Sequence, residues 1–258
     1  MLRRSLVWAL PALVATTLFG ASLAAYAATP AAVFTAAVND PARSAKDRER
    51  DAREKPAEVL AFAGIQPGMT VLDFFGGGGY YSELIANVVG PQGKVLLVNN
   101  APYTAFAKDD LKTRFEGRSL PNIERMTVES CDLRMGKNKL DAAVIVMSYH
   151  DLYYVDEKDG WAPIDGGKVL DQLHAALKPG GMFLIVDHAA KDGTGNKAAQ
   201  DLHRIEEVFA KRDIESHGFR LEKSYDGLRN TADDRSKLVF DPSIRGKTDR
   251  FVHVYRKI

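Results

Sequence analysis

The stretch from Val71 to Ala86, VLDFFGGGGYYSELIA, places four consecutive glycines between an apolar run and a second run with a helical pattern. The first run is typical of a buried strand, and the second is typical of a helix. Glycine at such a turn permits a positive φ and removes the Cβ that would block a close approach. The free N–H groups at the start of the following helix favour a polar or anionic ligand group. The stretch therefore predicts a turn that accepts a nucleotide-like ligand.

Short apolar segments alternate with helical segments on both sides of this turn. We expect strands at 70–75, 94–100, 123–130, 141–149, 182–190, 219–226 and 250–257, and helices at 56–64, 80–90, 105–116, 167–181 and 199–213. Apolar strands without polar alternation, separated by helices, indicate a sheet that is covered on both faces. The pattern therefore predicts a doubly wound α/β fold.

The composition narrows the classes of partner. The chain has 258 residues, of which 45% are hydrophobic and 27% are charged, as expected for one globular domain of moderate size. Its 35 basic and 34 acidic residues give a net charge of +1, so nucleic acid is not an expected partner. The single cysteine, Cys131, cannot form an intramolecular disulfide and is expected to be structural.

The N-terminal segment has the features of an export signal. Arg3 and Arg4 precede an apolar stretch, and Ala25-Tyr26-Ala27 has the small-x-small form of a signal-peptidase site. We therefore expect a signal peptide over residues 1–27, cut near Ala27, and a periplasmic or secreted protein with no stable insertion in the membrane. An uncleaved membrane anchor is the alternative, although Pro11, Thr16, Thr17 and Gly20 interrupt the apolar stretch.

The segment that follows the signal is alanine-rich and then densely charged. Residues 28–56 carry both signs of charge in mixed order, which favours a solvated N-terminal helical arm over a basic binding tail. The arm ends at Pro56. We expect the α/β domain to span residues 57–258.

The residues around the glycines indicate which nucleotide-like ligand is expected. A dinucleotide fingerprint requires a small residue where Tyr81 or Ser82 stands, and an acid where the second strand ends in Asn99 and Asn100. A phosphate-binding G-K-[ST] sequence does not follow the glycines. Asp73 instead precedes them, at a strand end where a carboxylate would meet a cation. A ligand with an amino-acid part and an adenosine part fits this arrangement better than a pyrophosphate.

The segment from Val71 to Tyr80 resembles motif I of the class I S-adenosylmethionine-dependent methyltransferases. Leu177 to His188, LKPGGMFLIVDH, resembles the turn and fifth strand of the same superfamily. Residues 45–258 as a whole are similar to a group of exported bacterial predicted methyltransferases. The resemblance implies a Rossmann-like seven-stranded sheet, mostly parallel with an antiparallel last strand, and S-adenosyl-L-methionine as the cofactor.

The resemblance also implies roles for individual residues. Asp73, Gly77 and Gly79 would line the methionine and ribose part of the cofactor. Asn99 or Asn100 would reach the ribose hydroxyls, and Asp132 the adenine amino group. The full set of predicted cofactor-binding residues is Asp73, Phe75, Gly76, Gly77, Gly78, Gly79, Tyr80, Asn99, Asn100, Asp132 and Ser148.

Two departures from the family pattern concern cofactor affinity. Phe75 replaces the first glycine of the motif, as in the D-x-F-x-G-x-G variant of DNA methyltransferases. Asparagine in place of the usual ribose-binding acid loses a charge-assisted hydrogen bond, so we expect weaker cofactor binding. Asn100-Ala101-Pro102-Tyr103 looks like the N-P-P-Y box of amino-group DNA methyltransferases, but it follows the second strand rather than the fourth.

The segment after the fourth strand carries the predicted catalytic residues, because in this architecture it faces the transferable methyl group. His150 is predicted as the general base and Asp151 as its neighbour in catalysis. The alternative is that these two side chains cap a helix or bond to each other. Asp187 and His188 end the fifth strand, where catechol-type O-methyltransferases hold a divalent metal; we favour His150 as base and no metal.

The sequence provides weaker evidence for the roles of other tyrosines and histidines. Five tyrosines are candidates for the wall of a substrate pocket or for ordinary core positions: Tyr80, Tyr81, Tyr149, Tyr153 and Tyr154. Four histidines are expected to have no chemical role: His174, His203, His217 and His253.

The sequence thus predicts an S-adenosylmethionine-dependent methyltransferase that acts on a small-molecule acceptor. One alternative is a non-catalytic S-adenosylmethionine- or nucleoside-binding protein of the same fold, because the cofactor is made in the cytoplasm and the chain is expected to be exported. Another is a metal-dependent O-methyltransferase.

Overall fold

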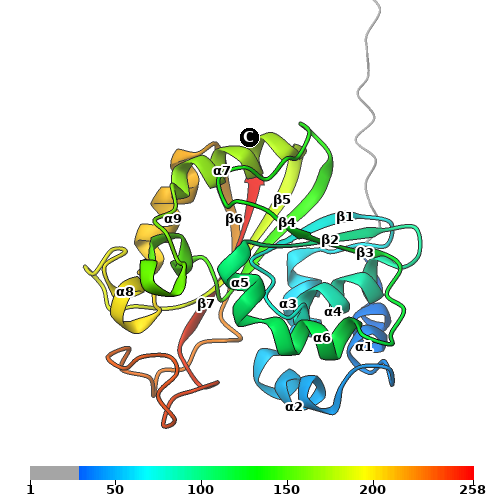
Figure 1. Ribbon diagram of the computed structural model, residues 1–258, viewed down its shortest axis with the longest axis horizontal. Coiled ribbons are helices and arrows are strands. Elements are labelled where there is room, and N and C mark those ends of the chain that lie inside the picture. Colours follow the sequence, from blue (N-terminus) through cyan, green and yellow to red (C-terminus); the bar gives the residue numbers. More distant parts are fainter. Residues whose placement is uncertain (1–28) are drawn as a thin grey trace, which may run out of the picture.

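The computed structural model describes residues 29–258, which form a seven-stranded sheet between two layers of helices (Figure 1). The predicted signal peptide, residues 1–27, lies outside the described residues. In the part that is described, no helix is both long enough and apolar enough to cross a membrane.

The sheet has the predicted topology. Its strands are β1 (Thr70–Phe74), β2 (Lys94–Asn99), β3 (Ile123–Thr127), β4 (Leu140–Val146), β5 (Leu177–His188), β6 (Phe219–Tyr225) and β7 (Arg250–Lys257). Their order is β3-β2-β1-β4-β5-β7-β6, and β7 runs antiparallel to both of its neighbours. The predicted fold class, a mostly parallel Rossmann-like sheet with an antiparallel last strand, is confirmed. The strand order changes direction between β1 and β4, which is where ligands bind in such sheets.

Helices cover both faces of the sheet and leave the carboxyl ends of the strands for the site (Figure 1). The helices are α1 (Ala31–Val38), α2 (Ala45–Glu54), α3 (Pro56–Ala63), α4 (Tyr80–Val89), α5 (Ala101–Phe106), α6 (Lys108–Phe115), α7 (Gly166–Ala176), α8 (Ala198–Leu202) and α9 (Glu207–Ser216), with 3₁₀ turns η1 (His150–Tyr153) and η2 (Glu157–Asp159). One apolar core joins α1, α3 and α4 to the sheet, and the other joins α7, α9 and η1.

The N-terminal segment is helical but is not the solvated arm that its charges predict. Phe34 and Ala37 of α1 are buried in the core shared with α3 and α4. Asp47 and Glu54 of α2 are buried as well. Asp47 and Glu54 pair with Arg114 and Arg250 of the domain beneath α2, whereas Lys46, Arg48, Glu49 and Arg53 remain exposed.

Three helix boundaries differ from the prediction. The helix expected at 199–213 is two helices, because His203 adopts φ 50° and Ile205 pairs with Ala189 beside the sheet. The helix expected at 167–181 ends at Ala176, and Leu177 already pairs with Leu140 of β4. The helix expected at 105–116 instead begins at 101 as α5 and continues from 108 as α6, since the Asn100 side chain caps the first turn.

Candidate functional site

The glycine turn after β1 forms the first part of the site. Gly77 has φ 56°, and a Cβ built on Gly76 would lie 2.5 Å from Oδ2 of Asp73. A side chain at Gly76 would therefore displace the strand-end carboxylate. Phe75 also has a positive φ, 53°, and its ring stacks on Phe74 and on Tyr103, with centroids 4.1 and 4.6 Å apart. These stacks hold a non-glycine residue in a conformation that glycine adopts more readily.

Asp73 is buried beneath this turn. Its Oδ2 accepts a hydrogen bond of 2.6 Å from the Ser82 hydroxyl at the start of α4. Burial raises the pKa of Asp73 to about 6, although the hydrogen bonds from Ser82 oppose the shift. The carboxylate is therefore charged at neutral pH and becomes neutral in mildly acidic solution.

The asparagines at the end of β2 have partners within the protein. Asn99 Oδ1 accepts a hydrogen bond from the Gly77 backbone N–H, and its Nδ2 donates to the Gly77 carbonyl, both at 3.0 Å. Asn100 Oδ1 accepts from the Tyr103 backbone N–H, and its Nδ2 donates to Ser130. A carboxylate at position 99 could not donate a hydrogen bond to the Gly77 carbonyl. Asparagine can make both hydrogen bonds and so stabilises the turn. Contact of either asparagine with a ribose stays a prediction.

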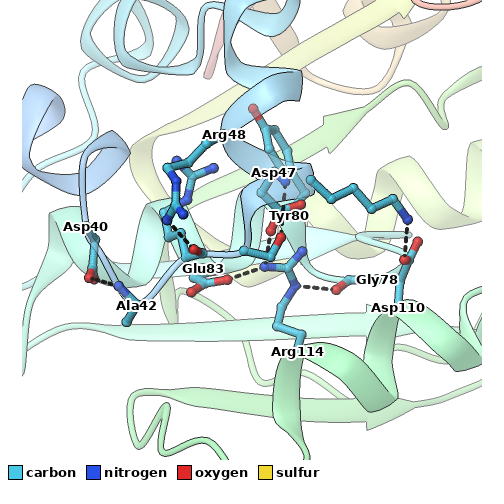
Figure 2. Close-up of polar contacts among 12 residues, drawn as sticks. Asp40, Ala42, Asp47, Arg48, Gly78, Tyr80, Glu83, Asp110 and Arg114 are labelled. Carbon is cyan, nitrogen blue, oxygen red and sulfur yellow. Dashed lines mark hydrogen bonds and ion pairs between the residues drawn. The ribbon is translucent and has the colours of Figure 1, made fainter.

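Helix α2 lies over the glycine turn and is fixed there by a buried ion cluster (Figure 2). Arg114 of α6 pairs with Asp47 of α2 at 2.8 Å and with Glu83 of α4, and its Nε donates to the Gly78 carbonyl at 2.6 Å. Figure 2 shows the Arg114 guanidinium between these three groups. Tyr80 adds a hydrogen bond of 2.6 Å to Asp51 of α2. The turn, α4, α6 and α2 are therefore one connected unit.

Two adjoining cavities open at this end of the sheet. One has a volume of about 290 Å³ and is lined by the glycine turn, Tyr80 and α2. The other has a volume of about 600 Å³ and is lined by the segment after β4, by His188 and His203, and by residues 239–250. Seven residues line both cavities: Lys46, Arg50, Arg53, Tyr103, Phe106, Asp110 and Met147. A ligand at the glycine turn can therefore adjoin a second molecule in the larger cavity.

The ends of β4 and β5 bring histidine and carboxylate side chains together at the larger cavity. Nδ1 of His150 lies 2.8 Å from Oδ1 of Asp187, and Oδ2 of Asp187 accepts from the His150 backbone N–H at 2.8 Å. Nε2 of His150 lies 3.3 Å from Oδ1 of Asp151. The other Asp151 oxygen accepts a hydrogen bond of 2.6 Å from the Tyr103 hydroxyl. The predicted convergence of these strand ends is thus present.

His203, to which the sequence analysis assigned no role, belongs to the same cluster. Its Nδ1 lies 3.4 Å from Oδ1 of Asp151, and its ring packs on Tyr154 with a centroid distance of 4.6 Å. The break between α8 and α9 places this imidazole over the site. A continuous helix was expected there, and 52 positions of sequence separate His203 from Asp151, so local spacing carried no signal of the contact.

The charge state of His150 depends on its two carboxylate neighbours. Burial lowers the pKa of His150, but Asp151 and Asp187 outweigh that effect and raise the pKa to about 9. Burial also lowers the pKa of His188 well below its usual range, and its Nδ1 lies 2.7 Å from the Thr248 hydroxyl. The base role predicted for His150 requires a neutral imidazole, which this arrangement disfavours at pH 7.

The remaining predicted residues lie in different surroundings: some line the cavities, and others lie in the core or on the surface. Asp132 is exposed, pairs with Arg134 at 3.4 Å and lines neither cavity, so its contact with adenine stays a prediction. Ser148 is buried, and its hydroxyl lies 3.5 Å from the Val146 carbonyl. Tyr149 and Tyr153 both donate to Asp213 of α9, whereas Tyr80 and Tyr154 line the cavities. Tyr81 is buried in the apolar core.

Comparisons with known proteins agree with this geometry. No family model matches the chain. The chain is 25% identical over 166 residues to a ubiquinone/menaquinone biosynthesis C-methyltransferase of Hahella chejuensis, covering 62% of this chain and 61% of that protein. It is 29% identical over 132 residues to an arsenite methyltransferase of Halobacterium salinarum, covering 49% of this chain and 29% of that protein. The chain thus spans less than two thirds of the length of these relatives.

A solved structure shows the same architecture. The S-adenosylmethionine-dependent methyltransferase from Aquifex aeolicus superposes with a TM-score of 0.57 at 21% identity, covering 83% of this chain and 97% of that chain. The protein therefore has the Rossmann-like fold of the class I methyltransferases, and S-adenosyl-L-methionine is the cofactor that this fold and these relatives imply.

The residues present fit that cofactor at the glycine turn. The nearest atom to a Cβ built on Gly77 is a ring carbon of Tyr103, 3.9 Å away, so this backbone borders the open cavity. Tyr80, the first residue of α4, lines the same cavity. Gly77, Gly78 and Tyr80 line the smaller cavity and are the residues that would hold the cofactor.

Proposed function

We propose that the protein is an S-adenosylmethionine-dependent methyltransferase that acts on a small molecule bound in the larger cavity. The observation that carries this proposal is the contact between the two cavities, one at the glycine turn and one at the histidine-carboxylate cluster. A cofactor at the turn would supply an electrophilic methyl group. The acceptor would lie between Tyr103 and His150, which both line the larger cavity.

The residues of the larger cavity support an acceptor that is partly aromatic or apolar and carries a polar reacting group. Tyr154, Trp161 and Phe240 provide apolar surface, whereas Arg53 and Arg245 provide positive charge. The histidines and Asp151 that line this cavity would contact the polar reacting group of the acceptor. The volume of about 600 Å³ suits a small molecule.

Ligand binding by a glycine variant tests the proposal. We expect S-adenosylhomocysteine to bind the purified protein in a calorimetric titration, and Gly77→Val to reduce its affinity by at least about 100-fold, because the new side chain projects into the cavity. Gly117→Val is the matched control, since Gly117 also has a positive φ, 70°, but borders open space. Equal loss of affinity in both variants, or no heat with the wild type, would contradict the proposal.

A further inference from the structure

In the part of the chain that the structure describes, the cluster at the bottom of the larger cavity contains two buried carboxylates with no arginine or lysine partner within 4.0 Å. Asp187 is fully buried and Asp151 is 6% exposed. Among residues 29–258, the ion pairs of both carboxylates within 4.0 Å are with histidines, namely His150 and His203. Buried carboxylates require compensating positive charge, because removing them from water is costly. Two of them together match the charge of one divalent cation.

Three donor atoms of the cluster face one another. Asp151 Oδ1 lies 3.3 Å from His150 Nε2 and 3.4 Å from His203 Nδ1, and the three atoms all lie within 4.8 Å of one another. Both separations exceed the roughly 2.7–2.9 Å of a charge-assisted hydrogen bond. Ligands bound tetrahedrally at about 2.05 Å from a zinc ion lie about 3.35 Å apart, which is close to the separations observed.

The surroundings orient these donors as metal ligands. Asp187 lies 2.8 Å from Nδ1 of His150, so a proton on Nδ1 leaves the lone pair of Nε2 directed at Asp151. Tyr103 donates to the second oxygen of Asp151, which leaves Oδ1 for the cluster. Tyr154 and Phe240 pack on the ring of His203, with centroid distances of 4.6 and 5.1 Å. A carboxylate behind a ligating histidine is the usual outer-shell arrangement of such sites.

We propose that His150, Asp151 and His203 bind a divalent transition metal, with zinc as the best match, at the bottom of the larger cavity. Two imidazoles and one carboxylate favour zinc over magnesium or calcium, which prefer oxygen ligands. Asp187 orients His150 and is not itself a ligand. This set of ligands differs from a metal site at Asp187 and His188, because His188 forms a hydrogen bond with Thr248.

The role of the ion rests on the proposed function. Three protein ligands leave a coordination position open toward the cavity, as in catalytic zinc sites. An acceptor O–H or S–H group would lose its proton to solvent and bind the ion through oxygen or sulfur. That oxygen or sulfur would form a bond to the methyl carbon of S-adenosylmethionine as the bond from this carbon to the sulfonium sulfur breaks, and S-adenosylhomocysteine would leave with the electron pair of the broken bond. The metal thus takes the place of the histidine base that the sequence predicted.

Metal titration of single variants tests the site. The protein is stripped with a chelator and titrated with Zn²⁺ against a chromophoric competitor, and with Co²⁺, whose visible absorption reports tetrahedral coordination. We expect one ion per chain, and a loss of affinity of at least about 100-fold in Asp151→Asn and in His203→Asn. Asparagine tolerates the left-handed backbone of position 203. Asp187→Asn should weaken binding by about 10-fold to 100-fold.

A surface histidine serves as the matched control. His217→Ala removes an imidazole that pairs with Asp171 outside the cavities and should leave Zn²⁺ affinity unchanged. Melting temperatures of all variants without metal show whether each one folds. Absence of stoichiometric binding to the wild type, or unchanged affinity in folded His203→Asn, overturns the proposed site.

The proposed metal site and the proposed methyltransferase function can be contradicted independently of each other. If the stripped protein still binds S-adenosylhomocysteine but no metal binds, the metal site is wrong and the proposed function stands. If Zn²⁺ binds and S-adenosylhomocysteine does not, the site stands and the methyltransferase proposal is wrong.

Discussion

At the scale of single residues, Asp73 shows how burial prepares a strand-end carboxylate for a ligand. The group is within hydrogen-bond distance of Ser82 and directly under Gly76. Its raised pKa means that the neutral form is favoured in the folded protein relative to the unfolded chain. The charge of Asp73 therefore costs free energy, which a nearby positive group on a ligand would recover.

This leads to a prediction for the pH dependence of ligand binding. The pKa of Asp73 is raised to about 6, so the carboxylate gains its charge as the pH rises through 6. S-adenosylhomocysteine, whose amino group is positive in this range, should bind more tightly at pH 7.5 than at pH 5. Isothermal titration across this range measures the effect. Asp73→Asn should bind weakly with little dependence on pH, and an unchanged slope in that variant would show that another group titrates.

At the scale of elements, α2 is attached to the glycine turn through charge rather than through apolar contact. Arg114 joins Asp47 of α2 to Glu83 of α4 at a buried position. Lys112 of α6 pairs with Glu116, the residue that follows the helix, but both of these side chains are about two-thirds exposed. The two pairs differ in their degree of burial and therefore in what their loss should cost.

Removing Arg114 should destabilise the protein strongly. Arg114→Met leaves Asp47 and Glu83 with less compensating charge in a buried site, and we expect the free energy of unfolding to fall by about 3–5 kcal/mol. Lys112→Met, on the same helix, should change it by less than about 1 kcal/mol. Urea denaturation followed by circular dichroism measures both changes. Similar small losses in the two variants would mean that the buried cluster does not secure α2.

The sequence predicted elements better than it predicted their contacts. Apolar runs and the glycine turn identified the sheet, because those signals are local. The ends of helices were harder to predict. The start of α5 depends on one hydrogen bond of the Asn100 side chain, and the end of α7 depends on the pairing of Leu177 with Leu140, which is distant in sequence. His203 was missed because its position follows from a helix break that brings it beside the residues after β4. Gly77 and His150, which line the cavities, could be predicted because family motifs and strand ends mark them directly.

At the scale of the whole molecule, the predicted export concerns a segment outside the described residues. The paired arginines, the apolar stretch and Ala25-Tyr26-Ala27 predict that the mature chain begins near Ala28. Cell fractionation with N-terminal sequencing should find the shortened chain outside the cytoplasmic membrane. A variant with Ala25 and Ala27 replaced by large residues should remain uncut. Recovery of the full-length wild-type chain from the cytosol would contradict export.

One wall of the larger cavity follows a segment that Arg204 ties to Ala189, the residue after β5. Arg204 is fully buried, forms two hydrogen bonds with Asp233, and donates to the carbonyls of Ala189 and Lys237. Beyond this anchor, residues 239–246 contribute Val239, Phe240, Arg245 and Gly246 to the cavity. The half that would hold the cofactor shares none of these four residues. A side chain at Gly246 would press on Arg53, which also lines the smaller cavity. A library of variants confined to Val239, Phe240 and Arg245 is therefore expected to change which acceptors fit while leaving cofactor affinity intact, so the choice of acceptor is open to engineering as an independent module.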